Sequence, residues 1–359
     1  MIKTDIAIVG GGPAGLCAAI SAASQGANVT IIEKASNLGG QLIKQTHMFF
    51  GSQKQYASTR GIDIPDILMN ELKKLGSLVN VMLDSTVLGL YEDGVLTVEQ
   101  NNKYIKIKPD SIIIATGASE KFLAFPNNDL PGIYGAGAVQ TLMNVHGIKP
   151  GNKVVMVGAG NIGLIVSYQL LQAGIEVKAI IDAAPKIGGY YVHASKVRRM
   201  GVPILTSHTV KYAHGKEVLK KVTIVKLDNN WQEVPGSEID IDADVMCISV
   251  GLSPLAELLW QVGCDMIYVP ELGGHVPVRN QELETSVKGV YVAGDVAGVE
   301  EASSAMVEGR LAGLCAAKNL GYAKENFEEL KNDCIEQLYS LRSGPVGEKI
   351  RAGLSKVIV

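Results

Sequence analysis

The sequence predicts an α/β protein of two doubly wound domains, the second inserted into the first, and three observations support this prediction. The chain opens with a short apolar strand, a glycine-rich turn, a helix and a second strand over residues 5–33. The same order of elements returns over residues 154–182. The C-terminal part then returns to the order of the opening unit, an apolar strand followed by a glycine-containing turn and a helix. Apolar strands that alternate with helices in this way predict parallel sheets.

Length and composition agree with two domains. The chain of 359 residues is longer than one ordinary domain. It is long enough for two domains that each bury their own core. A net charge of −3 gives no electrostatic case for binding nucleic acid. Glycines interrupt the uncharged stretches near both turns, so no membrane span is predicted, and the lack of an export signal favours the cytoplasm.

Cysteine usage points to a reducing compartment rather than to metal or disulfide chemistry. The five cysteines are scattered without a CxxC pair and without the spacing of metal ligands. We therefore expect free, buried thiols and no metal site. These residues are Cys17, Cys247, Cys264, Cys315 and Cys334.

The first glycine turn, Gly10 to Gly15, is typical of a turn that binds a nucleotide. Gly10 permits the tight turn out of the strand, and the next glycine lets a pyrophosphate approach the backbone. Gly15 lets helix and strand pack closely, and the helix N-terminus offers N–H groups to phosphates. Glu33 closes the next strand, where a carboxylate accepts hydrogen bonds from ribose hydroxyls.

The elements that follow complete the opening unit. A polar loop over residues 39–61 precedes a predicted helix over residues 63–75. Residues 79–108 form four short alternating runs separated by turn residues, which predicts a β-meander. An apolar strand over residues 111–114 follows and ends at Ala115-Thr116-Gly117.

The second turn, Gly158 to Gly163, repeats the plan, and Asp182 ends its second strand. Alternating residues 218–227 then lead to a strand that ends before residues 251–254, in the same role as the strand before Ala115. We expect residues 1–119 and 252–359 to form one domain around an inserted domain, residues 120–251. Joints rich in proline and glycine near residues 126–132 and 251–254 suit such an insertion.

A further carboxylate follows a strand of the tail. Asp295 comes after the apolar run at residues 289–293, which should lie in the same sheet as the opening strand. A carboxylate there can hold a sugar-alcohol chain such as the ribityl group of a flavin. The helix that begins near Glu300 would stabilise negative charge on a reduced flavin ring by about a kcal/mol or more.

Together these motifs resemble the flavoproteins with two Rossmann-like dinucleotide-binding domains, the pyridine-nucleotide oxidoreductases related to thioredoxin reductase. The resemblance covers nearly the whole chain and implies FAD in the outer domain and NADH or NADPH in the inserted one. The implied FAD residues are Gly10, Gly12, Pro13, Ala14, Gly15, Glu33, Lys34, Gly40, Gln41, Ala115, Thr116, Gly117, Gly294, Asp295, Glu301, Ala302 and Ser303. The implied pyridine-nucleotide residues are Gly158, Gly160, Asn161, Ile162, Gly163, Asp182 and Gly251.

The second nucleotide is the less defined of the two. Asp182 favours NADH over NADPH, because a carboxylate repels a 2′-phosphate and accepts a hydrogen bond from a 2′-hydroxyl. No arginine pair follows it directly, since Arg198 and Arg199 come later. A site that holds ADP or ATP without redox chemistry stays open as an alternative.

One departure from thioredoxin reductase bears on function. That enzyme carries a CxxC pair early in its inserted domain, whereas the corresponding segment here, residues 130–144, contains no cysteine. Thiol–disulfide exchange needs two close sulfurs, so disulfide reduction is not expected. Residues 115–144 and 294–313 are similar to the α-type subunits of heteromeric amino-acid, sarcosine, proline and opine dehydrogenases. In that group a β-subunit oxidises the substrate.

This narrower resemblance implies a partner dehydrogenase β-subunit, an iron–sulfur protein or both, in a homo- or hetero-oligomer. Many relatives carry a cysteine-rich extension, whereas residues 320–359 contain a single cysteine here, Cys334. Two alternatives remain: a stand-alone NAD(P)H-dependent reductase of ferredoxin or quinone, and a non-catalytic subunit that binds FAD or an adenine nucleotide. The sequence leaves open the substrate, the electron partner and the direction of electron flow.

Catalytic side chains are weakly indicated, because the flavin itself would carry the chemistry. His47 lies in the loop after Gly40-Gln41 and could act as an acid or base, although a loop histidine bonded to backbone is the simpler interpretation. Glu300 and Glu301 could transfer protons, but acids at a helix start mostly stabilise the helix.

Overall fold

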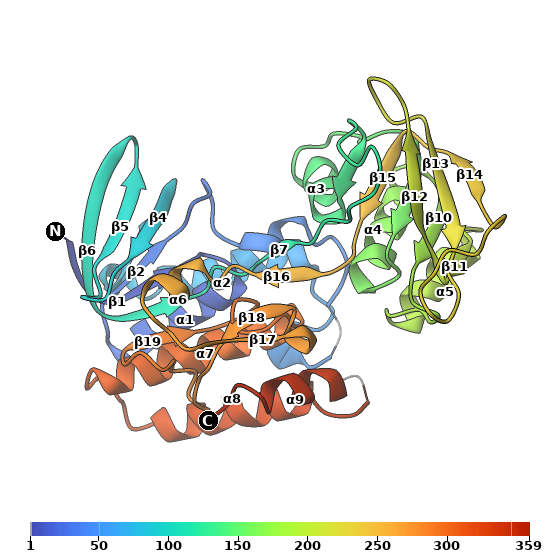
Figure 1. The fold of residues 1–359 in the computed structure, drawn as a ribbon. Coiled ribbons are helices and arrows are strands. Elements are labelled where there is room, and N and C mark those ends of the chain that lie inside the picture. Colours follow the sequence, from blue (N-terminus) through green and yellow to red (C-terminus); the bar gives the residue numbers. More distant parts are fainter. Residues whose placement is uncertain (1, 50, 346) are drawn as a thin grey trace. The chain divides into compact units, whose positions relative to one another are not determined.

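The computed structural model describes residues 2–49, 51–345 and 347–359. The chain divides into two compact units: residues 1–119 with 252–359, here called unit 1, and residues 120–251, here called unit 2. The short strands β7 (Ala118–Glu120) and β16 (Leu252–Pro254), where the chain passes between the units, pair with each other. Figure 1 shows both units and their elements.

Unit 1 is built on a seven-stranded sheet. Its parallel part contains β3 (Val79–Met82), β2 (Val29–Ile32), β1 (Ile2–Val9), β6 (Lys103–Ile114) and β19 (Val290–Val292), in that order. The antiparallel part adds β5 (Leu96–Gln100) and β4 (Ser85–Leu90) to β6. In β1, Ile6 and Ile8 pack on one face of the sheet, whereas Ala7 and Val9 pack on the other, because side chains alternate along a strand.

Two details of this sheet differ from the prediction. Residues 79–82 form a parallel strand beside β2 rather than the first strand of the meander. Residues 103–114 form one continuous strand, although the sequence suggested two. Both errors have one cause: an alternating pattern marks a strand but does not identify its neighbour or its direction.

Helices cover unit 1, and two of them pack at unusually close range. They are α1 (Pro13–Gln25), α2 (Ile64–Lys73), α6 (Glu257–Gln261), α7 (Ala302–Asn319), α8 (Phe327–Leu341) and α9 (Glu348–Leu354) (Figure 1). A Cβ atom on Gly309 or Gly313 of α7 would lie 2.1 or 2.2 Å from the carbonyl oxygen of Ala14 or Ala18 in α1. The small residues of α7 are therefore packing residues that let the two backbones touch.

Unit 2 repeats the doubly wound plan. Its parallel sheet has the order β11 (Ile204–Thr206), β10 (Glu176–Asp182), β9 (Lys153–Val157), β15 (Val245–Ile248) and β8 (Ile133–Gly135). An antiparallel sheet contains β12 (His208–His214), β13 (Lys221–Lys226) and β14 (Ile239–Asp242). The helices are α3 (Ala136–Gln140), α4 (Asn161–Gln172) and α5 (Tyr191–Arg199), and buried clusters line both faces of the parallel sheet. The predicted α/β class with two doubly wound domains is confirmed.

The remaining elements are short. Unit 1 contains the hairpin of β17 (Met266–Val269) and β18 (Gly274–Pro277). The 3-10 turns are η1 (Gly40–Lys44), η2 (Gln53–Gln55), η3 (Gly61–Asp63), η4 (Gly76–Leu78) and η6 (Pro270–Leu272), and η5 (Thr141–Val145) is a π-helical turn. Within the described residues, no helix combines the length and apolarity needed to cross a bilayer.

Candidate functional site

The predicted residues of unit 1 gather where four parallel strands end. Gly10 follows β1, Glu33 follows β2, Ala115 follows β6, and Ala293 and Gly294 follow β19. These strands lie side by side in the order β2, β1, β6 and β19. Ligands of open α/β sheets bind at this carboxyl edge, so the topology alone brings together residues that are far apart in the chain.

The first glycine turn is sterically required. Gly10 has a φ of +106°, and a Cβ atom on it would lie 2.3 Å from the Ala115 carbonyl oxygen. A Cβ atom on Gly15 would lie 1.9 Å from the carbonyl oxygen of Gly10. Gly12 differs, because within the described chain a Cβ atom there would meet only Gly40 Cα, at 3.8 Å. Space is therefore left in front of the N-terminus of α1, where N–H groups face outward.

Glu33 and a second glycine loop close around this turn. The Glu33 carboxylate accepts hydrogen bonds from the N–H of Gly11 at 2.6 Å and from the N–H of Ala35 at 2.8 Å. The N–H of Gly39 donates to the Gly11 carbonyl at 2.8 Å. A Cβ atom on Gly40, whose φ is +53°, would lie 2.7 Å from Gly12 Cα. The turn, the carboxylate and the loop thus form one cradle.

Unit 2 contains the same cradle at its own glycine turn. Cβ atoms on Gly158 and Gly163 would lie 2.1 Å from the carbonyl oxygens of Ser249 and Gly158, respectively. Asp182 accepts hydrogen bonds from the N–H groups of Ala159 at 2.6 Å and Ala184 at 2.8 Å. The two turns are therefore constructed alike, with Asp182 in the role of Glu33.

The second glycine loop of unit 2 also has its counterpart. The N–H of Gly189 donates to the Ala159 carbonyl at 2.9 Å, and the N–H of Tyr190 donates to Asn161 Oδ1 at 2.8 Å. A Cβ atom on Gly189 would lie 2.8 Å from the carbonyl carbon of Gly160. This loop lies against the turn as Gly39 and Gly40 do in unit 1.

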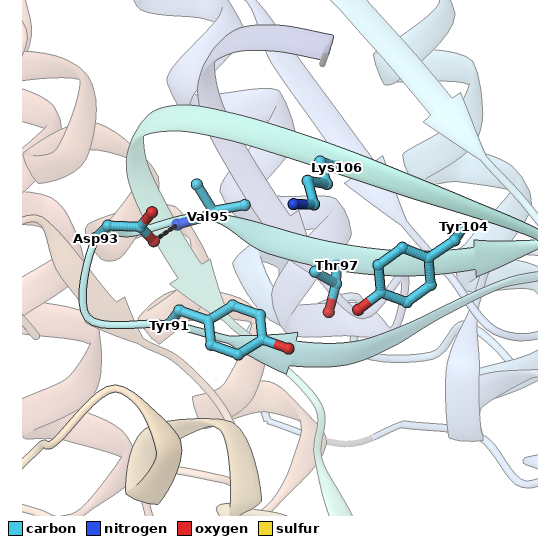
Figure 2. A pocket seen from close by; sticks show the side chains of 6 residues that line it. All are labelled: Tyr91, Asp93, Val95, Thr97, Tyr104 and Lys106. Carbon is cyan, nitrogen blue, oxygen red and sulfur yellow. Dashed lines mark hydrogen bonds between the residues drawn. The ribbon is translucent and has the colours of Figure 1, made fainter.

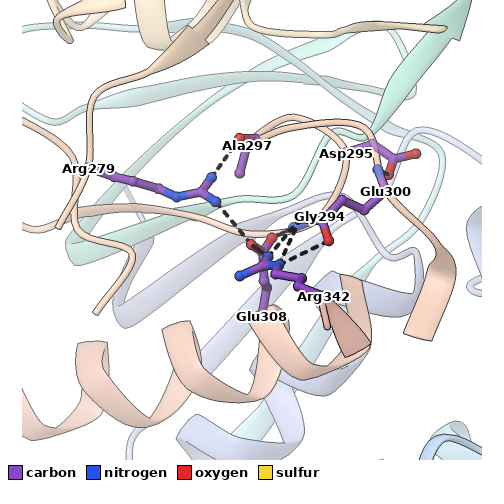
Figure 3. Close-up of polar contacts among 7 residues, drawn as sticks. All are labelled: Arg279, Gly294, Asp295, Ala297, Glu300, Glu308 and Arg342. Carbon is purple, nitrogen blue, oxygen red and sulfur yellow. Dashed lines mark hydrogen bonds and ion pairs between the residues drawn. The ribbon is translucent and has the colours of Figure 1, made fainter. Parts of the chain in front are cut away.

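A buried ionic cluster supports the Gly294–Asp295 turn of unit 1 (Figure 3). Glu308 of α7 is 2% exposed, and its carboxylate accepts hydrogen bonds from the N–H of Gly294 at 2.9 Å and from Arg279 at 3.0 Å. Arg342 donates to Glu308 at 2.6 Å and binds Glu300 through both Nε and Nη2, with a shortest distance of 2.7 Å. Arg279, which is 1% exposed, also donates to the Ala297 carbonyl at 2.6 Å. We call Arg279, Glu300, Glu308 and Arg342 the ionic cluster.

Burial dominates the proton affinities of this region. Desolvation, with the neighbouring charges of Glu308, Glu300 and Glu301, raises the pKa of Asp295 to about 7. Desolvation and the charge of Glu308 raise the pKa of Glu300, although Arg342 opposes this shift. Asp295 is therefore near its midpoint of ionisation at neutral pH.

The raised pKa of Asp295 predicts a pH dependence of stability in the ligand-free protein. Because the folded state binds this proton more tightly than the unfolded chain, whose ordinary pKa is 3.8, the stabilisation is present below pH 3.8 and is lost as pH rises through about 7. Asp295→Asn removes this contribution. We expect the variant to gain on the wild type by about 1.4 kcal/mol per pH unit in that window.

Urea unfolding of the two ligand-free proteins at a series of pH values between 4 and 8 measures this difference. The buffer series is run at about constant ionic strength, so that screening of surface charges does not change along it. Stability curves that stay parallel across the window would contradict the assignment.

The structure places the weaker candidates as follows. The His47 ring stacks on Phe49, with ring centroids 5.7 Å apart, in the loop between η1 and η2. Glu300 is bound by Arg342, which favours a structural role over proton transfer. Glu301 is the exposed N-cap of α7, so both acids precede the first turn of the helix instead of lying within it.

The other predicted residues take varied positions. Lys34 and Gln41 are exposed, Ala302 and Ser303 begin α7, and Ile162 is exposed in the first turn of α4. The Thr116 hydroxyl donates to the Leu255 carbonyl at 2.7 Å. Gly117 and Gly251 both have positive φ angles, of 75° and 120°.

Sequence reasoning missed Arg279, Glu308 and Arg342. One signal was available: Glu308 is an isolated acid within a helix otherwise rich in alanine, glycine and leucine. An acid in such a segment is rarely buried without a partner. The sequence could not identify that partner, because Arg279 and Arg342 lie 29 and 34 residues away along the chain.

A separate cavity of about 430 Å³ lies on the antiparallel part of the unit 1 sheet (Figure 2). It is lined by Tyr91, Asp93, Val95, Thr97, Tyr104 and Lys106. Tyr91 covers Gly89, where a Cβ atom would lie 3.2 Å from the tyrosine hydroxyl, so the aromatic ring shields a glycine in the strand. Tyr104 and Lys106 lie near the start of β6, whereas Gly10 of the cradle lies against Ala115, which follows the end of β6.

The chain's known relatives agree with this architecture. Residues 4–309 match the model of the pyridine nucleotide-disulphide oxidoreductase family. The opine oxidase A protein of Agrobacterium tumefaciens (strain Ach5), one subunit of that oxidase, is 26% identical over 336 residues, covering 88% of this chain and 66% of that protein. The HcnB subunit of hydrogen cyanide synthase from Pseudomonas protegens is 27% identical over 325 residues, covering 86% and 69%. The alpha subunit of sarcosine oxidase from Corynebacterium sp. (strain P-1) is 25% identical, and the match covers 90% of this chain but 33% of that protein.

Solved structures share the fold. L-proline dehydrogenase from P. horikoshii superimposes with a TM-score of 0.71 at 24% identity, covering 92% of this chain and 59% of that chain. Thioredoxin reductase of T. acidophilum gives a TM-score of 0.73 at 23% identity and covers 89% and 99%. The chain thus spans nearly the whole of the second protein and little more than half of the first.

Proposed function

The chain belongs to the pyridine nucleotide-disulphide oxidoreductase family, and from this premise we propose that it exchanges hydride equivalents between NAD(H) and FAD. We propose further that it acts as the α-type subunit of a heteromeric amino-acid or amine dehydrogenase. The chemistry that bound FAD supplies is two-electron exchange with a nicotinamide. The protein's own part is to bind and orient the two nucleotides.

One observation carries the proposal: the same cradle occurs in both units. Each contains a glycine turn required by sterics, a helix N-terminus with open space before it, and a carboxylate at the end of the next strand. These features fit a dinucleotide, whose pyrophosphate binds helix N–H groups and whose ribose binds the carboxylate. Two nucleotides in one chain suit a reaction that passes electrons from one to the other.

We assign FAD to unit 1 and the pyridine nucleotide to unit 2. In unit 1, Gly12 to Gly15 would hold the pyrophosphate, Glu33 a ribose, and Asp295 the ribityl chain. In unit 2, Gly160 to Gly163 would hold the pyrophosphate and Asp182 the ribose. Asp182 supports NADH over NADPH, because its carboxylate would repel a 2′-phosphate.

We propose that disulfide reduction is not among its activities. Each of the five cysteines is buried. Burial raises the pKa of Cys17 and Cys334 to about 11, so the reactive thiolate is disfavoured at neutral pH. Free thiols also suit a reducing compartment, and we place the protein in the cytoplasm.

The relatives support a partner chain. The matched proteins of opine oxidase, hydrogen cyanide synthase and sarcosine oxidase are each named as one subunit of an enzyme. We therefore propose that a dehydrogenase β-subunit, an iron–sulfur protein or both exchange electrons with this chain in an oligomer.

Anaerobic mixing of the purified, FAD-loaded protein with NADH, and separately with NADPH, tests the proposal. We expect NADH to bleach the flavin absorbance band rapidly and NADPH to do so more slowly, because Asp182 disfavours the 2′-phosphate. A band that neither nucleotide bleaches would contradict electron transfer and would favour a non-catalytic, nucleotide-binding subunit. Turnover by the lone chain with ferredoxin or quinone would instead favour a stand-alone reductase over an α-type subunit.

A further inference from the structure

The C-terminal segment, described over residues 342–345 and 347–359, contributes to the ionic cluster. Arg342 follows the end of α8, and its backbone carbonyl accepts a hydrogen bond from Arg351 of α9. The last residues also hold Arg279: its N–H donates to the Val357 carbonyl at 3.0 Å, and its carbonyl accepts from the N–H of Val359 at 3.1 Å. The segment therefore supplies one arginine of the cluster and fixes the backbone of the other. The family match ends at residue 309, before this segment begins.

The cluster acts on the Gly294–Asp295 turn through specific atoms. Glu308 accepts the N–H of Gly294, and Arg279 donates to the carbonyl of Ala297. The N–H of Ala297 donates to the Gly294 carbonyl at 2.8 Å, so the cluster holds both ends of the turn over residues 294–297, which contains Asp295. The N–H of Glu300 donates to Asp295 Oδ1 at 3.3 Å. Arg342 joins the two glutamates, because its guanidinium contacts Glu300 and Glu308 together.

Charge balance gives Arg342 a second effect. Together with desolvation, the carboxylates of Glu308, Glu300 and Glu301 raise the pKa of Asp295. The cations Arg342 and Arg279 form ion pairs with this group: Arg342 pairs with both Glu300 and Glu308, whereas Arg279 pairs with Glu308 and acts on Glu300 through its charge. Without the charge of Arg342, Asp295 would hold its proton to higher pH. The negative charges of Glu300 and Glu308 would be less compensated, and like charges in one buried site disfavour ionisation.

We propose that Arg342 is a positioning residue of the cofactor site: it ties Glu300 to Glu308 and thereby fixes the Gly294–Asp295 turn and its charge for binding the ribityl chain of FAD. This inference rests on the proposed assignment of FAD to unit 1. Arg342 acts through the two glutamates. The C-terminal segment thus supports the proposed cofactor site from outside the residues of the family match.

The test measures the dissociation constant of FAD from the full-length protein between pH 5 and 9. In the wild type we expect affinity to rise as Asp295 ionises, because an ionised carboxylate accepts ribityl hydroxyl bonds more strongly. In Arg342→Gln we expect the midpoint of this rise to move upward by about one pH unit. Arg342→Lys keeps the charge but lacks the two-pronged geometry, so its midpoint should stay near that of the wild type while affinity falls about tenfold.

Arg198→Gln is the matched control, because Arg198 is exposed on α5 of unit 2. Thermal unfolding of each FAD-free variant separates folding defects from binding defects. A midpoint that Arg342→Gln leaves unchanged, or a wild-type affinity that does not vary with pH, would overturn this inference alone. Wild-type protein that binds no FAD would overturn the proposed function as well, so the two failures are distinguishable.

Discussion

Gly160→Val is expected to weaken the binding of NADH by about 100-fold, or ~2.7 kcal/mol, while the fold and the FAD content stay unchanged. Gly160 has φ −74° and ψ 179°, an extended conformation that suits valine. A Cβ atom there would meet no atom of the described residues within 4 Å. The added side chain therefore costs the protein little, but it occupies the space before α4 where we place the pyrophosphate.

Gly163→Ala gives the contrasting case in the same turn. Its Cβ atom would lie 2.1 Å from the Gly158 carbonyl oxygen, so this change should destabilise unit 2 itself. Calorimetric titration with NADH, together with thermal unfolding, separates the two variants. Wild-type affinity in a well-folded Gly160→Val protein would show that the nucleotide does not bind at this turn.

Glu308→Ala is expected to lower the free energy of unfolding of unit 1 by about 3–5 kcal/mol, the cost of breaking a buried ion pair. The substitution leaves Arg279, which is 1% exposed, without its carboxylate partner. It also removes the acceptor of the Gly294 N–H and one partner of Arg342. A buried cation without a counter-charge is among the most destabilising features of a protein interior.

A single-tryptophan background makes this measurement specific to unit 1. The chain has two tryptophans, and Trp231→Phe leaves Trp260 of unit 1 as the fluorescent probe of urea unfolding. Glu176→Ala serves as the control, because Glu176 pairs with Lys178 at the surface and should leave the midpoint unchanged. Equal midpoints for Glu308→Ala and this control would refute the assigned role of the cluster.

The sequence predicted what depends on local geometry. The glycine turns, Glu33 and Asp182 each lie at the end of a strand, so a short stretch of chain contains the whole signal. The position of β3 was mispredicted, because residues 79–82 alternate like a meander strand but pair in parallel with β2. The ionic cluster escaped prediction for another reason: Arg279, Glu308 and Arg342 become partners only when α7, α8 and the last residues pack together.

The contact between α1 and α7 has a dynamic consequence. Gly309 and Gly313 bring the backbone of α7 into direct contact with Ala14 and Ala18 of α1. Neither helix therefore has room to slide or rotate without the other. One helix begins at the first glycine turn, and the other begins shortly after Asp295. The two ends of the proposed FAD site in unit 1 are therefore expected to fluctuate as a single rigid body, and a ligand that reduces the motion of one end should reduce that of the other.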